Sequence, residues 1–176
     1  MEGGSVMKVC CQELDTPIGK LLVAASSSGI CRICFPSESE SDRAHWFDRY
    51  FSMAPLEGVE GALAEAMEQL LRYFQGREET FDLPLDLRGT PFQIRVWRQL
   101  LEIPYGTTLS YGEVARAIGN PRASQAVGSA VGKNPVPIVV PCHRVLGHDG
   151  SLVGFGGGLP TKEKLLKLEG VPVGEL

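Results

Sequence analysis

The chain has 176 residues, of which 43% are hydrophobic, so it is long enough to bury a core as one domain or as two small ones. No apolar run approaches the roughly 20 residues that a membrane-spanning helix needs, and Met1 to Lys8 holds no stretch of signal-peptide length. We therefore expect no membrane partner and a cytoplasmic location, or a nuclear one if the source is eukaryotic. The five cysteines, an odd number, are then expected to be reduced thiols.

The net charge of −4, taken alone, argues against a nucleic-acid partner, but the charge is unevenly distributed. Residues 1–87 carry 7 Lys and Arg against 15 Asp and Glu, a net −8, whereas residues 88–176 carry 10 against 6, a net +4. The second half can therefore meet a phosphate backbone, while the first half cannot.

The first half contains strand and helix patterns. Short runs rich in Val, Ile, Leu and Cys, separated by turn residues, predict antiparallel strands at Met7–Leu14, Lys20–Ala25 and Ile30–Phe35. Two amphipathic segments predict helices at Asp42–Phe51 and Gly61–Phe74, the second of which ends at Gly76. The stretch Phe81–Gly89 alternates apolar and acidic residues, which predicts a last strand plus a linker. We place a domain boundary there, giving domains 1–88 and 89–176.

The second half is predicted to be mostly helical. Thr90 and Ser110 each begin a capping box, the first opening a helix with Pro at its first position and the second a helix that stops at Gly119. Asn120 and Pro121 predict the start of a third helix, which runs to about Gly132. Two short helices joined by a Gly-containing turn form a helix-turn-helix pattern, a moderate signal for DNA binding. The predicted fold class is α+β, with a small N-terminal antiparallel sheet and helices before a mostly helical C-terminal domain.

The third of these helices has an unusual composition. Its predicted core stripe is made of small apolar residues, namely Ala123, Ala126, Val127, Ala130 and Val131. The opposite side carries Ser124, Gln125, Gly128, Ser129, Gly132 and Lys133. A glycine inside a helix costs up to about 1 kcal/mol relative to alanine, so two on one side indicate close approach of another backbone. Tight packing against a neighbouring helix and insertion into a narrow DNA groove both remain open here.

The stretch NPVPIVVPCHRV, residues 134–145, carries the most chemical information. Three prolines enclose an apolar run whose exit presents Cys142 beside His143. A thiol is a weak nucleophile until it is deprotonated, and a nearby imidazole is a common means of activating it. Adjacent residues of an extended chain point in opposite directions, so a bridging water could be needed to connect the pair. A Cys-His dipeptide is equally compatible with a structural role.

Pro-Cys-His-Arg-Val preceded by Asn-Pro-Val-Pro, with a helix-turn-helix pattern upstream, resembles the O6-alkylguanine-DNA alkyltransferases. The resemblance runs from about Thr90 to Gly170, nearly half of the chain. The first half is similar to the family's small sheet-and-helix domain through DTPIGKL, residues 15–21, and the predicted helix at residues 61–76.

This resemblance implies DNA repair by direct reversal, with no metal and no cofactor. An alkyl group would move from O6 of guanine, and from O4 of thymine as well, to Cys142. The transfer would be irreversible and would happen once per molecule, because the thioether product is stable. The expected partner is double-stranded DNA carrying O6-alkylguanine, bound through its minor groove by a monomer.

The resemblance also implies a role for each residue around the thiol. Cys142 would be the nucleophile and alkyl acceptor, and His143 would take its proton through a water. Glu169 would orient His143, although the helical lysines at 162, 164 and 167 leave a surface ion pair as the other interpretation. Asn134 would brace the turn that holds the cysteine loop, which is compatible with an ordinary helix C-cap. Arg144 is expected to serve structure rather than the reaction.

Other residues would recognise the substrate. Tyr111 would donate a proton near N3 of guanine, where charge develops as the alkyl carbon is attacked, unless it is only an aromatic packed on the core. The flipped base would meet the carbonyls of Cys142 and Val145 and the N–H of Gly156, in a glycine loop that includes Phe155 and Gly157. The DNA would be contacted by Arg122, Ser124, Gln125, Gly128, Ser129 and Lys133.

The chain departs from the family's pattern at several positions. Gln125 stands where the family usually has an arginine that fills the gap left by the flipped nucleotide, so the positive charge and the stacking plane are lost. Arg122, one turn earlier, would compensate in part. Phe155 and Gly156 replace the tyrosine and serine common in the glycine loop, and both changes leave the backbone donor in place.

Some relatives carry zinc in the first domain, and Cys-x-x-Cys is a ligand spacing. The thiols in question here are Cys10, Cys11, Cys31 and Cys34. A strand over residues 30–35 would point Cys31 and Cys34 to opposite faces, which favours buried structural thiols over a zinc site.

Three other functions compete with alkyl transfer. A non-catalytic protein that binds alkylguanine lesions would lack the reactive cysteine, and Cys142 is present. A helix-turn-helix transcriptional regulator would not need the Pro-Cys-His-Arg-Val loop. A Cys-His hydrolase of small esters or peptides would leave no permanent adduct on the thiol.

Overall fold

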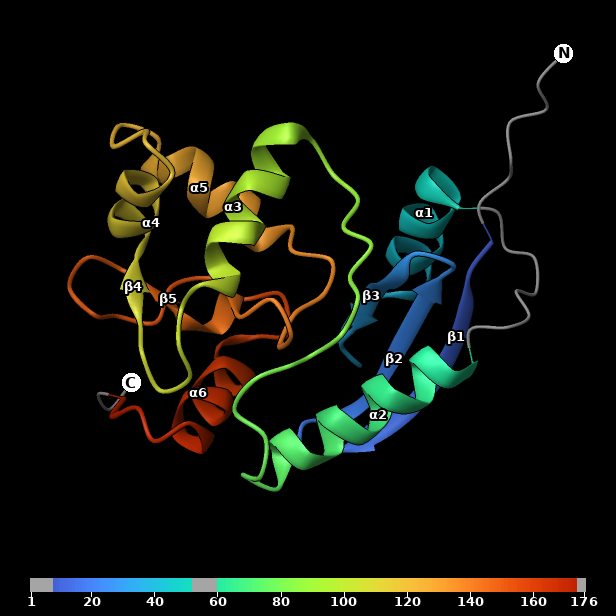
Figure 1. The fold of residues 1–176 in the computed structure, drawn as a ribbon. Coiled ribbons are helices and arrows are strands. Elements are labelled where there is room, and N and C mark those ends of the chain that lie inside the picture. The colour runs from blue at the N-terminus through green and yellow to red at the C-terminus, as the bar shows by residue number, and fades with distance from the viewer. Residues whose placement is uncertain (1–7, 52–59, 174–176) are drawn as a thin grey trace, which may run out of the picture. The chain divides into compact units, whose positions relative to one another are not determined.

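The structure is a computed structural model that describes residues 8–51 and 60–173. The chain divides into two compact units, Met1–Arg88 and Gly89–Leu176 (Figure 1). Within the described residues, no helix has the length and apolar character needed to cross a membrane.

The first unit is built on a three-stranded antiparallel sheet in the order β1-β2-β3. Its strands are β1 (Cys10–Thr16), β2 (Gly19–Ser26) and β3 (Gly29–Cys34), so the three predicted strands are confirmed, with the first beginning later than expected. Met7, the predicted start of the first strand, lies outside the described residues. Tight turns join the strands because glycines at positions 19 and 29 adopt positive φ angles.

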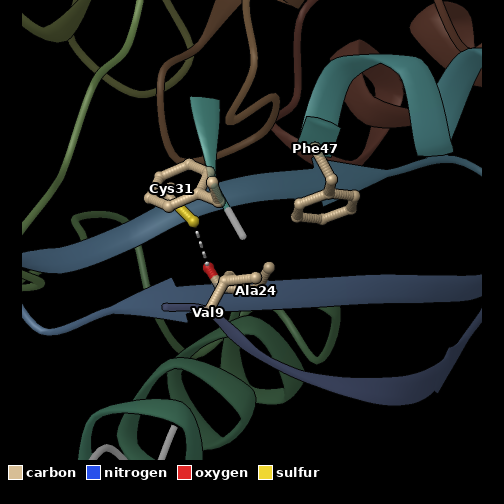
Figure 2. Packing of buried hydrophobic residues seen from close by; sticks show 5 residues of the cluster. Val9, Ala24, Cys31 and Phe47 are labelled. Atoms are coloured by element: carbon tan, nitrogen blue, oxygen red, sulfur yellow. Dashed lines mark hydrogen bonds between the residues drawn. The ribbon is translucent and has the colours of Figure 1, made fainter. Parts of the chain in front are cut away.

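Two helices pack on this sheet. Helix α2 (Glu60–Phe74) contacts all three strands through a buried face that includes Leu63, Ala66 and Leu70. Helix α1 (Glu40–Tyr50) contributes Phe47 to a separate apolar cluster with Val9, Ala24, Cys31 and Phe51 (Figure 2). Both predicted helices are therefore present, and the unit has a core of its own.

The expectation that Cys31 and Cys34 lie on opposite faces of the sheet is wrong. The register shifts between Ala24 and Ala25, so Cys31 occupies a bulge with no direct partner across the sheet. Cys31 then packs in the same cluster as Leu22, and Leu22 is the residue paired directly with Cys34. Directly paired residues share a face, so both thiols point to the side covered by α1.

The predicted strand within residues 81–89 is also wrong. This segment makes a single bridge, in which Leu85 lies beside Ile30. The Ile30 N–H donates to the Pro84 carbonyl at 2.8 Å, and the Asp86 N–H donates to the Ile30 carbonyl at 2.9 Å. Pro84 has no N–H to extend such a ladder, so the contact stays short.

The second unit contains four α-helices among its described residues, together with a short two-stranded ladder. The helices are α3 (Pro91–Leu101), α4 (Tyr111–Ala117), α5 (Ser124–Gly132) and α6 (Leu159–Leu168). Both predicted capping boxes are confirmed, at Thr90 with Gln93 and at Ser110 with Glu113.

The third predicted helix begins later than expected. Asn120 and Pro121 lie in a turn, and α5 starts at Ser124. The Asn120 N–H donates to the Ala115 carbonyl at 2.9 Å, and Gly119 has a φ of +78°, so these residues close the preceding helix instead of opening the next. Ala126, placed in the predicted core stripe, is exposed.

Helix α5 packs against both α3 and α4. The indole N–H of Trp97, a residue 1% exposed, donates to the Ala130 carbonyl at 2.8 Å, which fixes α5 on α3. Strand β4 (Leu109–Ser110) pairs in parallel with β5 (Val145–Leu146). This ladder joins the start of α4 to the chain that follows Cys142.

Candidate active site

The cysteine loop is held from inside by one buried amide. Asn134 Nδ2 donates to the Val140 carbonyl at 2.8 Å, and Asn134 Oδ1 accepts from the Val136 N–H at 3.0 Å. Within the described residues, Ile138 is the only non-glycine residue with a positive φ, at 76°. A β-branched residue is strained in that conformation, so the surrounding hydrogen bonds and prolines must hold it there. The loop therefore delivers its exit residue in a fixed geometry.

That exit residue is Cys142, the first residue of a 3₁₀ turn, η1 (Cys142–Arg144). Its side chain is only 6% exposed. Burial raises the pKa of the Cys142 thiol to about 11, although a hydrogen bond from Asn134 and the positive charge of Lys162 oppose the increase. The thiol is therefore protonated at neutral pH and needs a base before it can act as a nucleophile.

His143 and Glu169 meet directly beneath this turn. His143 Nε2 lies 3.0 Å from Glu169 Oε1, and both side chains are buried. Burial lowers the pKa of His143, an effect that its contact with Glu169 opposes, so the imidazole is neutral at pH 7. Because Nε2 faces a carboxylate, we assign the ring proton to Nε2 and the basic lone pair to Nδ1.

Arg144 shares the same carboxylate. Its Nη2 donates to Glu169 Oε1 at 2.6 Å, its Nε lies 3.0 Å from Oε2, and its Nη1 donates to the Ile103 carbonyl at 2.6 Å. Burial disfavours the ionised form of Glu169, but hydrogen bonds from His143 and Arg144 outweigh it and lower the pKa to about 2. Glu169 is thus a buried anion, and the alternative of a surface ion pair is excluded for it.

Tyr111 begins α4, which the β4–β5 ladder brings to the turn at Cys142. Burial raises the pKa of Tyr111, and so does the negative charge that the nearby Cys142 carries when it is ionised. The hydroxyl donates to the Val153 carbonyl at 2.9 Å, and the ring covers Gly128 of α5. Tyr111 is only partly buried.

The glycine loop, residues 153–158, lies between β5 and α6. Gly156 is exposed, Phe155 and Gly157 are partly buried, and no described residue accepts a hydrogen bond from the Gly156 N–H. The Cys142 carbonyl accepts from the Val145 N–H, and the Val145 carbonyl accepts from Lys162 Nζ at 2.6 Å. Each carbonyl has a second lone pair, so both can take a further donor.

The predicted DNA-facing residues form one surface around α5, which we call the α5 surface. Arg122, Gln125, Ser129 and Lys133 are exposed, and Ser124 and Gly128 are partly buried. A Cβ on Gly132 would meet nothing within 4 Å, and one on Gly128 would lie 3.7 Å from the Tyr111 ring, an ordinary contact. Packing among the described residues of the second unit therefore requires neither glycine, which argues against the first of the two explanations offered by the sequence.

Lys162 was missed as a candidate site residue by the sequence analysis, which grouped it with the surface lysines of α6. It is 0% exposed. The pattern Lys162, Leu165, Leu166, Glu169 follows the i, i+3, i+4, i+7 spacing of a buried helix face, and that spacing is the signal that could have identified it.

No group of three or more His, Cys, Asp or Glu among residues 8–51 and 60–173 lies close enough to hold a metal ion. Burial raises the pKa of Cys31 and of Cys34 to about 12, so both thiols of the Cys-x-x-Cys pair are protonated at neutral pH.

Both units match domains of one protein family. Residues 91–171 match the 6-O-methylguanine DNA methyltransferase, DNA binding domain, and residues 9–87 match its ribonuclease-like domain. The chain is 48% identical over 157 residues to a methylated-DNA–protein-cysteine methyltransferase of Mycobacterium bovis, with 89% of each chain covered. A relative of the same name from Methanosarcina acetivorans is 44% identical over 158 residues, covering 89% of this chain and 95% of that one.

A solved structure extends this similarity to three dimensions. Mycobacterium tuberculosis OGT in complex with DNA has 45% sequence identity and a TM-score of 0.77, with 92% of both chains covered. By domain content, sequence identity and fold, the chain belongs to the 6-O-methylguanine DNA methyltransferase family.

Proposed function

We propose that the protein repairs DNA by transferring an alkyl group from O6 of guanine, and from O4 of thymine, irreversibly to its own Cys142. The observation that carries this proposal is a buried thiol at the end of a braced loop, next in sequence to an imidazole that is bound to a buried carboxylate. A duplex substrate in the genome implies action in the cytoplasm of a prokaryote or in a nucleus.

The transfer begins with deprotonation of the thiol. The Cys142 proton passes to Nδ1 of His143 through a bridging water. The ionised Glu169 then stabilises the imidazolium. Arg144 holds the Glu169 carboxylate in place. Its positive charge also lowers the pKa of His143, so it partly offsets the stabilisation of the imidazolium by Glu169.

The thiolate sulfur then attacks the alkyl carbon. An S–C bond forms as the C–O6 bond breaks, and the electron pair of the broken bond passes into the guanine ring. Tyr111 donates its proton at N3 as this charge develops, and is reprotonated when the imidazolium returns the proton through solvent. For this proton donation to N3, the Tyr111 hydroxyl must first break its hydrogen bond to the Val153 carbonyl. That carbonyl would still accept a hydrogen bond from Lys162 Nζ, which lies 3.2 Å away.

The flipped base would be read by backbone groups. The Cys142 carbonyl accepts one hydrogen bond from the Val145 N–H, and the Val145 carbonyl accepts one from Lys162, so each has a second lone pair for the base. The Gly156 N–H, in the glycine loop, would donate a hydrogen bond to the base. The α5 surface would lie in the minor groove of duplex DNA, where Gly128 and Gly132 of α5 would admit the sugar-phosphate backbone. Gln125 would fill the gap left by the flipped nucleotide, and a single protein molecule would bind each lesion.

Mass spectrometry tests the proposal directly. The protein is mixed with duplex DNA containing one O6-methylguanine, and peptides are mapped for added methyl groups. We expect one methyl group per molecule, on Cys142 only, and no further turnover when fresh substrate is added. Cys10→Ala serves as the matched control and should react as the wild type does. Lesion binding without an adduct, or turnover beyond one equivalent, would refute alkyl transfer to this cysteine.

A further inference from the structure

The first unit contains a cavity on the face of its sheet that α1 covers. Its volume is about 160 Å³, and it is lined by Glu13, Lys20, Leu21, Leu22, Pro36 and Arg43. Glu13 and Leu22 are paired directly across β1 and β2, and Lys20 lies two residues before Leu22, so these three side chains share one face. Arg43 comes from α1. Neither the cysteine relay nor the base contacts involve these residues.

The cavity has an apolar floor and a fixed outer wall. Leu21 is buried and Leu22 is half-buried. Pro36 follows β3 and packs on the turn between β1 and β2, where a Cβ on Gly19 would lie 2.8 Å from the Pro36 Cγ. Residue 19 must therefore be glycine if Pro36 is to stay in place. An apolar cavity of about 150 Å³ admits a benzene ring, so a body of that size fits here.

Arg43 brings a positive charge that no described carboxylate neutralises. Its Nε is buried and, among residues 8–51 and 60–173, has no hydrogen-bond acceptor. The acidic side chains on either side of it in the chain are engaged elsewhere, since Glu38 pairs with Arg32 and Asp42 accepts from Ser39. Buried polar groups in folded proteins usually have partners, so this guanidinium indicates a ligand that supplies an acceptor.

The other groups around the cavity leave this charge uncompensated. Glu13 Oε2 lies 3.4 Å from Lys20 Nζ, so these two opposite charges pair with each other. Burial raises the pKa of Cys11 to about 11 and that of Cys34 to about 12, although the positive charge of Arg43 opposes both increases. Both thiols are therefore neutral at pH 7. The charged side chains that line the cavity then sum to one positive charge.

The charge of the surrounding unit restricts the kind of anion that can enter. Residues 1–87 carry 7 Lys and Arg against 15 Asp and Glu, a net −8. This unit therefore repels a polyanion such as DNA over long range, whereas a small anion with a single charge meets far less repulsion. The apolar floor further favours an anion with an apolar body over a fully hydrated one.

We propose that this cavity binds a small organic carboxylate with an apolar body about the size of a benzene ring. The carboxylate accepts hydrogen bonds from the Arg43 guanidinium, whose planar donors match the two carboxylate oxygens. The apolar body lies against Leu22 and Pro36. Binding of this ligand involves the first unit alone and does not rest on alkyl transfer.

NMR titration of the full-length protein with benzoate tests the proposal at constant ionic strength. The Arg43 Nε–H signal and the Leu22 backbone N–H signal should shift together and saturate, with a Kd of about 10 mM or tighter. Benzamide has the same shape without the charge and should bind at least about tenfold more weakly. Inorganic phosphate, which has no apolar body, should also bind at least about tenfold more weakly.

Two results with the wild type alone would overturn the proposal. One is the absence of saturation by about 100 mM benzoate, and the other is an equal Kd for benzoate and for either comparison ligand. These results do not depend on the folding of any variant.

Arg43→Met tests the residue itself, because it removes the charge and keeps an unbranched side chain. Followed through the Leu22 N–H signal, this variant should bind benzoate at least about tenfold more weakly. Arg49→Met removes an exposed arginine from the last turn of the same helix and is the matched control, which should bind as the wild type does. Unchanged binding by Arg43→Met, or an equal loss in both variants, would refute the role of Arg43.

Discussion

Replacing Glu169 with glutamine removes the charge of a buried anion while keeping its shape. The carboxylate, 6% exposed, binds both His143 and the Arg144 guanidinium. Its pKa is lowered from 4.5 to about 2, which corresponds to about 3 kcal/mol of folding free energy at pH 7. Breaking a buried ion pair by removing one partner costs about 3–5 kcal/mol, which is of the same size. We therefore expect Glu169→Gln to lower the free energy of unfolding by about 3 kcal/mol.

The pH dependence of this loss follows from the direction of the pKa shift. The pKa of Glu169 is lower in the folded chain than in the unfolded chain, so the stabilisation is complete above about pH 6 and is lost as the pH falls toward 2. By pH 3.5 the wild type should have lost about 1.5 kcal/mol of it, whereas the glutamine variant has none to lose. The difference between the two proteins should therefore shrink by about half.

Urea unfolding followed by tryptophan emission measures this difference in the second unit alone. The chain has two tryptophans, Trp46 in the first unit and the buried Trp97 in the second, so a Trp46→Phe background isolates the relevant signal. Glu163→Gln is the matched control, because Glu163 forms an i,i+4 pair with an exposed lysine and should contribute less than about 1 kcal/mol. A loss below about 1 kcal/mol for Glu169→Gln, or a difference independent of pH, would refute the reasoning.

Three further predictions concern the reaction. Cys142→Ala should abolish transfer and retain binding to alkylated duplex DNA, measured by mass spectrometry and fluorescence anisotropy; any stoichiometric transfer by this variant would contradict the assignment. Because added volume in a packed site costs about 1–3 kcal/mol, the methylated protein should melt at a lower temperature in calorimetry, and an equal or higher Tm would argue against a tight pocket. Gln125→Arg should tighten duplex binding, steepen its salt dependence by close to one unit in the log–log slope, and accelerate duplex repair without changing the reaction with free O6-alkylguanine base. Equal acceleration of both substrates would exclude Gln125 as the residue that fills the flipped-base gap.

Local signals in the sequence predicted much of the second unit. Thr90 and Ser110 fix the starts of α3 and α4 because each capping box needs only residues within one turn. The start of α5 was placed too early, since Asn120 is required to close the preceding helix and a residue cannot serve both ends. Strand boundaries in the first unit were predicted to within a few residues for the same local reason.

Errors arose where long-range contacts decide the structure. The bulge at Cys31 depends on pairing with β2, and alternation along a single strand cannot reveal it. Segment 81–89 alternates like a strand, yet only Leu85 bridges a neighbour. The burial of Lys162 shows the same limit. Its charge predicts a surface position, but its ammonium group donates hydrogen bonds to three backbone carbonyls outside its own helix, which compensate for burial.

Gly128 and Gly132, which packing does not require, imply a conflict between the thermal stability of α5 and its close approach to DNA. Among the described residues, a Cβ at Gly132 would meet no atom outside its own helix within 4 Å, and one at Gly128 would make only an ordinary contact. Each replacement by alanine should therefore stabilise the helix by up to about 1 kcal/mol. If α5 enters the minor groove as proposed, each added methyl group would stand in the path of the DNA backbone. Selection for thermal stability alone should then favour alanine at both positions. The resulting protein should be more stable but should repair duplex DNA poorly.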